Sequence, residues 1–555
     1  MLVRKRLSSF RRSPVSAEPE RFLDRGSKIV VAACCVVFLL CGLAIVPYLG
    51  IEQDEALFAA ALYAPKSYLA GITVLHATLP TMQMSYLGCL KAWVYKAIFV
   101  LWPPSVYSLR VPVLLLGALT IFLFWLLLRR TVGDRAAIIG AALLATDTSF
   151  LMTTCFDWGP VALQHLLTVA GVLALVYFHQ LGGETLLGLA FLLFGLAFWD
   201  KALFSWIFTG LTVGSLLVFP AEVCQKMNAR RLLIAAFCLC LGALPLICAN
   251  LRQHVSTFGK EDVTFSTSQI DHKFAVLRAT ADGSLLFGLV GSEGAPKPRA
   301  AHSPLQSLST SLARVTAGYR KNLANPAFAA ALILLPLLWR TPARKPLLFA
   351  LAVCWLAWAL MAITGRAGTS AHHAILLWPF PTLAVAVAFA TASKRSCFGR
   401  RVLPVAITLL ITANLLLTNQ YLAGFIRNGG SRVWDDAIFA LADYLQSSGA
   451  SHIYTIDWGS ANGLRLLARG ALHLTEECYV LAQPQLSMVA RKSVLAMISD
   501  PDHILVGYTG SPAFPGVNKK LEDLAETAGY EKVVIKTVYD REERPVFEVF
   551  RFHRR

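Results

Sequence analysis

Three acidic residues follow directly after a long apolar stretch near the start of the chain. Glu52, Asp54 and Glu55 lie in IEQDEALF, and the stretch before them reads SKIVVAACCVVFLLCGLAIVPYLG. A carboxylate near an apolar interface can have a raised pKa, which suits a general base. Solvated acids are also common beside a membrane, but Asp54 heads the apolar segment ALFAAALYA. We therefore expect Asp54 to be a catalytic base.

Two tight turns between apolar stretches carry further charged residues. Asp157 lies in CFDWGPV, where it could cap the next helix, a role that does not exclude pointing at a substrate as well. Asp200 and Lys201 lie in LAFWDKALF. They form either a local ion pair or a site in which Lys201 is a fixed cation for a phosphate.

A third group of candidates combines arginine with histidine. Arg366, His372 and His373 lie in ITGRAGTSAHHAILLWPF, and Arg252 follows an apolar stretch in CANLRQH. Adjacent histidines point in different directions on a helix, so metal binding by both is not expected. Orientation of a substrate, contact with a phosphate and a structural role at the interface all stay open for this group.

The composition is that of a membrane protein. Hydrophobic residues make up 56% of the 555 residues, charged residues 15%, and the mean hydropathy is +0.57. The net charge of +18 comes from clusters of Lys and Arg between apolar runs, which fits membrane orientation better than nucleic-acid binding. Most of the twelve cysteines lie inside apolar runs, so no disulfide framework is expected.

About eleven apolar segments are candidates for crossing some 30 Å of hydrocarbon. They cover residues 29–49, 108–128, 136–153, 160–178, 185–199, 202–219, 232–250, 327–339, 346–364, 373–391 and 402–421, of which the fifth and eighth are short. With the basic residues 1–27 in the cytoplasm, the basic loops RRTVGDR, QKMNARR, RTPARK and SKRSCFGRR also lie inside. The candidate residues then share the outer face.

The sequence predicts two main domains after the N-terminus. Residues 28–421 form a transmembrane domain, with extracytoplasmic loops at 50–107 and 252–325. Residues 422–555 form a small extracytoplasmic α/β domain, with strands in HIYTIDW and HILVGYT and two more around the charged turn in EKVVIKTVYDREERPVFEVFRF.

These motifs together resemble the GT-C class of membrane glycosyltransferases, in particular the protein O-mannosyltransferase and lipid A aminoarabinose transferase group. The resemblance covers residues 28–392 and is carried by QDEALFA, by Asp157, by the arginine in YSLRVPVLLLGAL, by LGLAFWDKALF and by HHAILLWPFPTLAVAVA. The segment HATLPTMQM departs from the family pattern, because many relatives have a proline pair there.

The resemblance implies an inverting transfer of a hexose or pentose from a polyprenyl-phosphate donor to a protein, lipid or glycan acceptor on the outer face. Asp54 would be the base, while Lys201, Arg366 or Arg252 would stabilise the departing phosphate. Asp157 would orient hydroxyl groups, and Glu55 would do the same or help to hold a divalent cation. No cofactor follows from the residues themselves, and the need for a metal stays open.

Two other classes of function compete with this interpretation. A transporter or lipid flippase would place charges at mid-membrane and show repeated halves, whereas here the acids gather at one face. A binding module would use the tail domain and only be anchored by the helices. The compact loops favour a bacterial inner membrane protein that contacts membrane lipids and no nucleic acid. The sequence does not identify the sugar, the acceptor or the oligomeric state.

Overall fold

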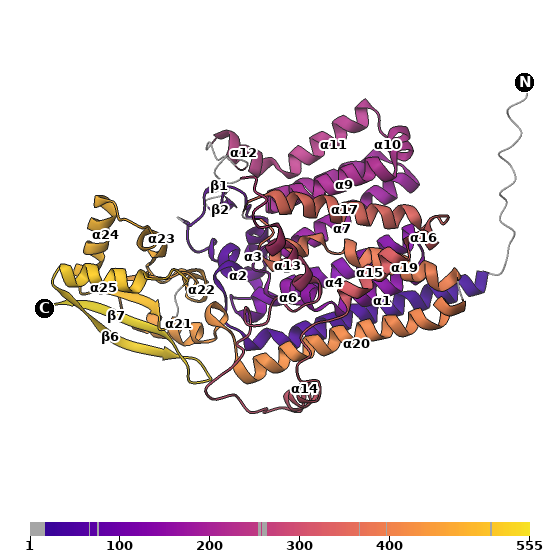
Figure 1. Cartoon of the computed structure of the whole chain (residues 1–555). Helices are drawn as coiled ribbons and strands as arrows, with labels where there is room; N and C mark the ends of the chain where they lie inside the picture. The colour runs from indigo at the N-terminus through magenta and orange to yellow at the C-terminus, as the bar shows by residue number, and fades with distance from the viewer. Residues whose placement is uncertain are drawn as a thin grey trace, which may run out of the picture.

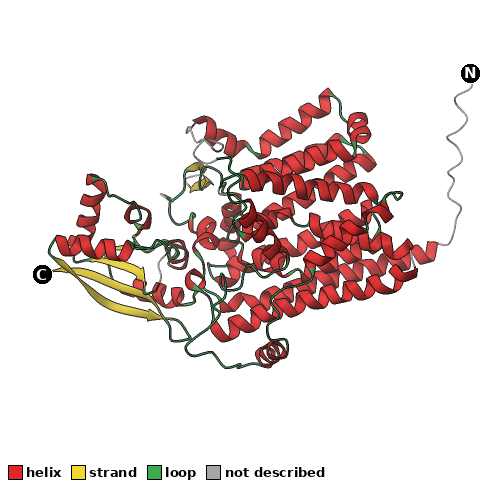
Figure 2. Cartoon of the chain, in the orientation of Figure 1, coloured by secondary structure: helices red, strands yellow, loops and turns green. Residues whose placement is uncertain are grey.

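A computed structural model describes residues 17–65, 67–74, 77–252, 257, 264–365, 367–395, 397–510 and 513–555. A bundle of helices makes up most of the molecule, and a smaller part with a β-sheet lies at one end of it (Figures 1 and 2). The two parts are continuous through the last long helix of the bundle.

Five helices are each long and apolar enough to cross a membrane. These are α1 (Ala17–Ile45), α4 (Val106–Thr131), α7 (Val161–Leu181), α17 (Arg344–Ile363) and α20 (Cys397–Asn428). Capping residues at the start of helix α4 and basic residues in its last turn account for where it begins and ends. Ser105 and Ser108 form a capping box at its start, and Arg129 and Arg130 lie in its last turn, where the helix dipole favours cations.

Four pairs of helices meet these criteria together but are bent at a short break. The pairs are α5–α6 (Asp134–Thr146, Thr148–Phe156; 57°), α9–α10 (Phe204–Val218, Pro220–Lys226; 99°), α11–α12 (Ala229–Gly242, Leu244–Arg252; 71°) and Ala371–Leu377 with α19 (Phe380–Arg395; 41°). The segment Ala371–Leu377 consists of α18 (Ala371–Ala374) and the 3₁₀ turn η2 (Ile375–Leu377). Asp147 ends α5 and caps α6 by accepting from the Phe150 amide, which accounts for the first break.

The described residues thus hold five to nine spans by length and composition, fewer than the eleven expected from the sequence. The difference lies in α8 (Glu184–Asp200) and α15 (Ala324–Ile333), at the predicted fifth and eighth spans. At 1.5 Å per residue they are about 26 and 15 Å long, short of the hydrocarbon thickness. The prediction of eleven spans is therefore not confirmed.

The loop after α1 is built from short elements that pack onto the bundle. They are the turn η1 (Val46–Tyr48), α2 (Gln53–Ala60), the hairpin β1–β2 (Ala70–Val74, Ala77–Met82) and α3 (Leu90–Leu101). Three further helices follow α12, namely α13 (Ile270–Ala281), α14 (Pro304–Val315) and the short α16 (Leu335–Leu338).

The tail contains a five-stranded mixed sheet in the order β4-β3-β5-β7-β6. Four of these strands, β3, β5, β6 and β7, lie where the sequence predicted strands. Its elements are η3 (Arg432–Trp434), α21 (Ala437–Ser447), β3 (His452–Thr455), α22 (Ala461–Leu467), β4 (Leu474–Glu476), α23 (Cys478–Leu481), α24 (Met488–Ser499), β5 (His503–Tyr508), α25 (Val517–Thr527), β6 (Tyr530–Tyr539) and β7 (Pro545–Arg554). Alternate residues of β5 face opposite sides of the sheet. Ile504 and Val506 pack in the cluster with α21, whereas Leu505 packs with α24 and α25.

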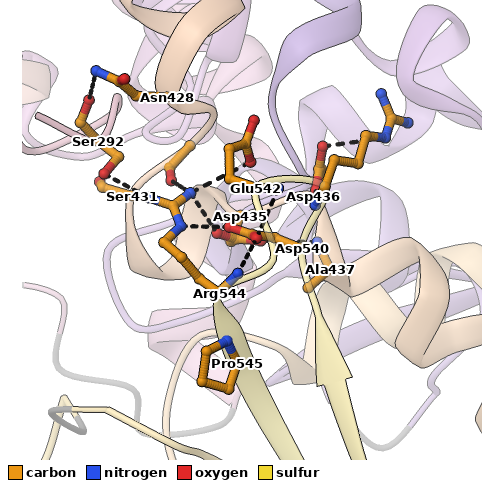
Figure 3. Close-up of polar contacts among 12 residues, drawn as sticks. Ser292, Asn428, Ser431, Asp435, Asp436, Ala437, Asp540, Glu542, Arg544 and Pro545 are labelled. Carbon is orange, nitrogen blue, oxygen red and sulfur yellow. Dashed lines mark hydrogen bonds and ion pairs between the residues drawn. The ribbon is translucent and has the colours of Figure 1, made fainter. Parts of the chain in front are cut away.

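An arginine-rich network joins the turn between β6 and β7 to the bundle (Figure 3). Arg544 Nε donates to Asp540 at 2.5 Å, and its Nη1 and Nη2 donate to Ser292 Oγ (2.6 Å) and Gly430 O (3.1 Å). Its Nη2 also lies 3.3 Å from Asp435. Burial, together with the neighbouring Asp540 and Asp436, raises the pKa of Asp435 to about 8 against the opposing Ala437 amide and Arg544.

Replacement of Arg544 tests whether this network holds the tail in place. We expect Arg544→Gln to lower the stability of the folded chain by about 3 kcal/mol, because it leaves buried acids without their partner. The readout is thermal unfolding in detergent. Arg541→Gln is the matched control, since Arg541 contacts the same network from a side chain that is 61% exposed. Equal shifts for the two variants would contradict this role of Arg544.

Candidate active site

Helix α2 presents the acids of the first loop, and Glu52 is used to start it. The Glu52 carboxylate accepts from the backbone amides of Asp54 (2.7 Å) and Glu55 (2.9 Å). The Glu55 carboxylate in turn accepts from the Glu52 amide, which completes a capping box. Glu52 is thus bound to the backbone of its own helix.

Arg110 of α4 fixes α2 to the bundle. It forms two bonds to Glu55, from Nε to Oε1 (2.6 Å) and from Nη2 to Oε2 (2.9 Å). Its remaining donors bind the carbonyls of Val46, Leu49 and Gly50, so the guanidinium is fully buried and satisfied. The sequence analysis placed Glu55 in the reaction. In the structure both of its oxygens accept from Arg110.

Asp54 differs from its two acidic neighbours. It is half-buried, and within the described part of the chain its carboxylate accepts no hydrogen bond. Burial raises the pKa of Asp54 to about 6, while the Lys201 ammonium opposes this shift and Glu476 adds to it. Asp54 is therefore a carboxylate whose proton affinity lies near neutrality.

The tail domain reaches this site through Gln53. The Gln53 side chain donates to Glu476 Oε1 (3.0 Å) in β4 and accepts from the Asn462 amide (2.9 Å) at the start of α22. Asn462 Nδ2 also donates to Gln53 O (3.2 Å). Burial raises the pKa of Glu476, and Arg465 opposes that shift. A second carboxylate thus stands next to Asp54, from a domain to which the sequence analysis assigned no site residue.

Asp157 lies at the end of α6 and is almost fully buried. Its Oδ1 accepts from the amides of Val161 (2.6 Å) and Ala162 (2.9 Å) at the start of α7. Its Oδ2 lies 2.8 Å from Lys91 Nζ, which also donates to the Asp157 carbonyl at 2.8 Å. The sequence analysis expected Asp157 to orient a substrate. These partners give it the capping role that was also considered, together with a buried ion pair, and a cap does not exclude contact with a substrate.

Asp200 and Lys201 lie where α8 meets the first loop. Gln164 Nε2 donates to Asp200 Oδ2 (3.0 Å), and Lys201 Nζ donates to Gly159 O (3.1 Å). No ion pair joins Asp200 to Lys201 in the described part of the chain. The Lys201 ammonium instead interacts electrostatically with Asp200, Asp157 and Asp54 together. It is a buried cation facing several acids.

Close backbone packing holds Lys201 in this place. Leu87 of the first loop forms a β-bridge with Lys201, and the Ala202 amide donates to Tyr86 O at 2.9 Å. A Cβ on Gly88 would lie 1.8 Å from the carbonyl oxygen of Trp199. Only glycine allows this approach, so Gly88 sets the distance between the first loop and α8.

The two adjacent histidines line the same region. The His372 and His373 rings lie 4.3 Å apart, His372 packs on Trp158, and His373 packs on Trp206. His372 Nδ1 pairs with Ser370 Oγ at 2.9 Å, whereas His373 Nδ1 is buried without a partner among the described residues. Both rings interact electrostatically with Lys201. The turns at residues 156–160 and 199–201 and the start of α18 therefore converge.

The remaining candidates do not join this group in the described part of the chain. Arg252 is exposed in the last turn of α12, and no contact joins it to Lys201 there. Arg366 lies outside the described residues. No group of three or more His, Cys, Asp or Glu residues that could hold a metal was found among the described residues.

Three residues of the site were not predicted from the sequence. Lys91 carried a signal, because it is a lone lysine in the otherwise apolar segment YLGCLKAW. Gln164 looks like any polar residue in a helix, and Glu476 lies 423 positions from its partner Gln53. No local pattern could identify these two.

No protein-family model and no curated protein matches the sequence. Among solved structures, ArnT from Cupriavidus metallidurans bound to undecaprenyl phosphate is similar over 96% of this chain and 98% of that one, with 14% identity and a TM-score of 0.59. The apo state of ArnT gives a TM-score of 0.54 with the same identity and coverage. Arabinofuranosyltransferase AftD from Mycobacteria covers 94% of this chain and 39% of that one, with 16% identity and a TM-score of 0.47.

The chain has a GT-C fold. This confirms, for the fold, the resemblance drawn from the sequence. The alignment with ArnT covers nearly all of both chains. The family's sequence motifs reached only residue 392.

Removal of Arg110 tests the anchoring of α2. We expect Arg110→Ala to cost about 3–5 kcal/mol of stability, because Glu55 would remain buried without a partner. Thermal unfolding in detergent measures this loss. Arg129→Ala on the same helix is the control, since Arg129 pairs with an Asp134 side chain that is 41% exposed and should cost about 1 kcal/mol or less. A small loss for Arg110→Ala would show that α2 is held by other contacts.

The charge of Glu476 should be visible in the ionisation of Asp54. Removal of a neighbouring negative charge favours the ionised form, so Glu476→Gln should lower the pKa of Asp54 below about 6. Any process that needs ionised Asp54 is lost as pH falls through this pKa, and in the variant that loss should move to lower pH. Lys532→Gln changes a residue of β6 that is remote from Asp54. It should leave the pH dependence of that process unchanged. An unchanged profile for Glu476→Gln would contradict the coupling.

Proposed function

We propose that this chain is an inverting glycosyltransferase that moves a hexose or pentose from a polyprenyl-phosphate donor to a hydroxyl or amine of an acceptor. The observation that carries this proposal is the position of Asp54. It is the first-loop acid that remains open to a substrate, and it lies in the electrostatic field of the buried Lys201 ammonium. A base and a fixed cation are what such a transfer requires.

In the proposed reaction Asp54 takes the proton of the acceptor. As that proton moves to the carboxylate, the acceptor oxygen or nitrogen forms a bond to the anomeric carbon from the face opposite the phosphate. The bond between the anomeric carbon and the phosphate oxygen breaks, and its electron pair leaves with the phosphate. A pKa of about 6 leaves Asp54 ionised and ready at neutral pH.

Lys201 is the residue we assign to the leaving phosphate. Its amine is already desolvated and held by the Gly159 carbonyl, so little reorganisation is needed as negative charge develops. His372, His373 and Asp200 surround it and would orient the sugar or the phosphate. Glu55 and Asp157 serve this site through Arg110 and Lys91 rather than by contact with the substrate.

The donor lipid also needs room for its tail. An apolar cavity of about 280 Å³ lies among α13, α15, α17 and α19, lined by residues such as Phe274, Trp358 and Val385. It fits a segment of a prenyl chain. ArnT, whose fold this chain shares, has been seen bound to undecaprenyl phosphate.

The proposed location follows from the basic loops and the compact form of the chain. We place the protein in a bacterial inner membrane, with the site and the tail domain on the extracytoplasmic side. The acceptor is a protein, a lipid or a glycan, and the tail domain contacts the site through Gln53.

The test is donor consumption by the purified chain in detergent. A panel of radiolabelled polyprenyl-phosphate sugars is supplied, and release of the sugar or its transfer to water or acceptor is measured. We expect one donor to be consumed, and Asp54→Asn to slow the reaction by about 10²–10⁴-fold, the usual contribution of a general base. Lys201→Met should reduce the rate by about 10²–10³-fold.

Asp443→Asn is the matched control, because Asp443 is an exposed acid on α21. It should retain full activity. If Asp54→Asn turns over like the wild type while remaining folded, Asp54 is not the base. If no donor is consumed by the wild type, the transporter or flippase interpretation replaces this one.

A further inference from the structure

Helix α14 has its apolar and polar faces reversed relative to a helix of a water-soluble protein. Leu305, Leu308, Leu312 and Val315 form one stripe along it, and their exposed fractions range from 37% to 85%. Ser309 and Thr310 on the opposite side are buried. A stripe that is apolar and exposed is stable when it faces lipid rather than water.

The buried side of α14 is bound to α20. Asn419 Nδ2 donates to Ser309 O (3.0 Å), and Gln420 Nε2 donates to the carbonyls of Ala313 (3.2 Å) and Thr316 (2.9 Å). These contacts lie about 13 Å before the end of α20, from its rise of 1.5 Å per residue. Figure 1 shows α14 nearly end-on while α20 lies along the picture, so the two helices cross. A helix that crosses a spanning helix near its end lies in the plane of the membrane surface.

A basic cleft opens beside this helix. Its volume is about 270 Å³. It is lined by Arg314 from α14, Arg320 from the turn that follows and Arg427 from the end of α20. Arg320 donates to Glu293 at 2.6 Å and stacks on Phe287, which in turn stacks on Tyr421 at 4.0 Å. In the described part of the chain neither Arg314 nor Arg427 has an acidic partner. Glu293 is the one carboxylate in the lining, so the cleft is left with two uncompensated positive charges.

The wall of the cleft is rigid because the network in Figure 3 holds it. Asn428 Nδ2 donates to Ser292 O at 3.2 Å, and Ser292 Oγ accepts from Arg544. Both Ser292 and Asn428 line the cleft. Its shape is thus fixed by the same contacts that dock the tail domain, and its two open guanidinium groups lie at the edge of a lipid-facing helix.

We infer that this cleft binds the phosphate headgroup of an anionic lipid whose hydrocarbon chains lie along the leucine stripe of α14. Guanidinium groups bind phosphate through two parallel hydrogen bonds, which a neutral surface could not offer. The volume is below the roughly 300–1,000 Å³ of pockets that enclose a whole small molecule, so it suits a headgroup with its tail outside. The headgroup is that of a bulk anionic phospholipid, because the exposed leucine stripe beside the cleft faces the surrounding bilayer.

The experiment is a lipid titration of the delipidated full chain, followed by native mass spectrometry. Phosphatidylglycerol, phosphatidylcholine and a polyprenyl phosphate are each titrated against the wild type and Arg314→Gln/Arg427→Gln. We expect the wild type to retain the anionic lipids, and the double variant to bind them at least tenfold more weakly. If the substitutions weaken retention of the polyprenyl phosphate but not of phosphatidylglycerol, the occupant is not a bulk phospholipid and the proposal is overturned.

Two further variants keep the result clear. Arg491→Gln/Lys519→Gln removes two cations that line a separate cleft of the tail, and it should bind lipid like the wild type. Arg314→Lys/Arg427→Lys keeps the charge and should retain part of the binding. The proposal is overturned if the Gln double variant binds phosphatidylglycerol as the wild type does, or if phosphatidylcholine binds as tightly. Sugar transfer is not measured, so this result is independent of the proposed reaction.

Discussion

The paired hydrogen bonds between Arg110 and Glu55 are the interaction on which the site depends. A buried guanidinium costs several kcal/mol in lost hydration, and only a complete set of acceptors offsets that cost. Here the acceptors are one carboxylate and three carbonyls in η1 and the residues just after it, so they tie α2 and the segment after α1 to α4. Because Glu55 and Glu52 are bound in this way, Asp54 is the acid between them whose carboxylate is left open.

A second constraint is the gathering of buried charges from separate turns. Lys91 pairs with Asp157, and Lys201 faces Asp54 and Asp200. These amines and carboxylates lie in a region that little water reaches. Each charge there strongly affects the proton affinity of the next, because the surrounding dielectric is low. The close approach at Gly88 keeps these turns together, so the electrostatic setting of Asp54 depends on backbone packing as well as on charged residues.

The sequence was sufficient to find the candidate acids and the turns that carry them, because charged residues stand out in apolar surroundings. Asp54, Lys201 and the histidine pair do converge in the structure. Arg110 as the partner of Glu55 and Lys91 as the partner of Asp157 could not be predicted, since a residue type does not reveal which partner binds its oxygens. Glu476 was out of reach because its place beside Gln53 depends on how the tail docks. The count of eleven spans is not confirmed, because apolar runs do not show where a helix bends or stops short.

The bond between Gln53 and Glu476 also sets an order of events during biosynthesis. It joins residues 423 positions apart, and the Gly50 amide similarly donates to the Trp434 carbonyl. The first loop is therefore made early but reaches its final surroundings only when nearly the whole chain has been synthesised. Contacts over such sequence separations form late, because the long loop between them must close first. A nascent chain would thus carry the Asp54 carboxylate for most of translation without the domain that completes its environment.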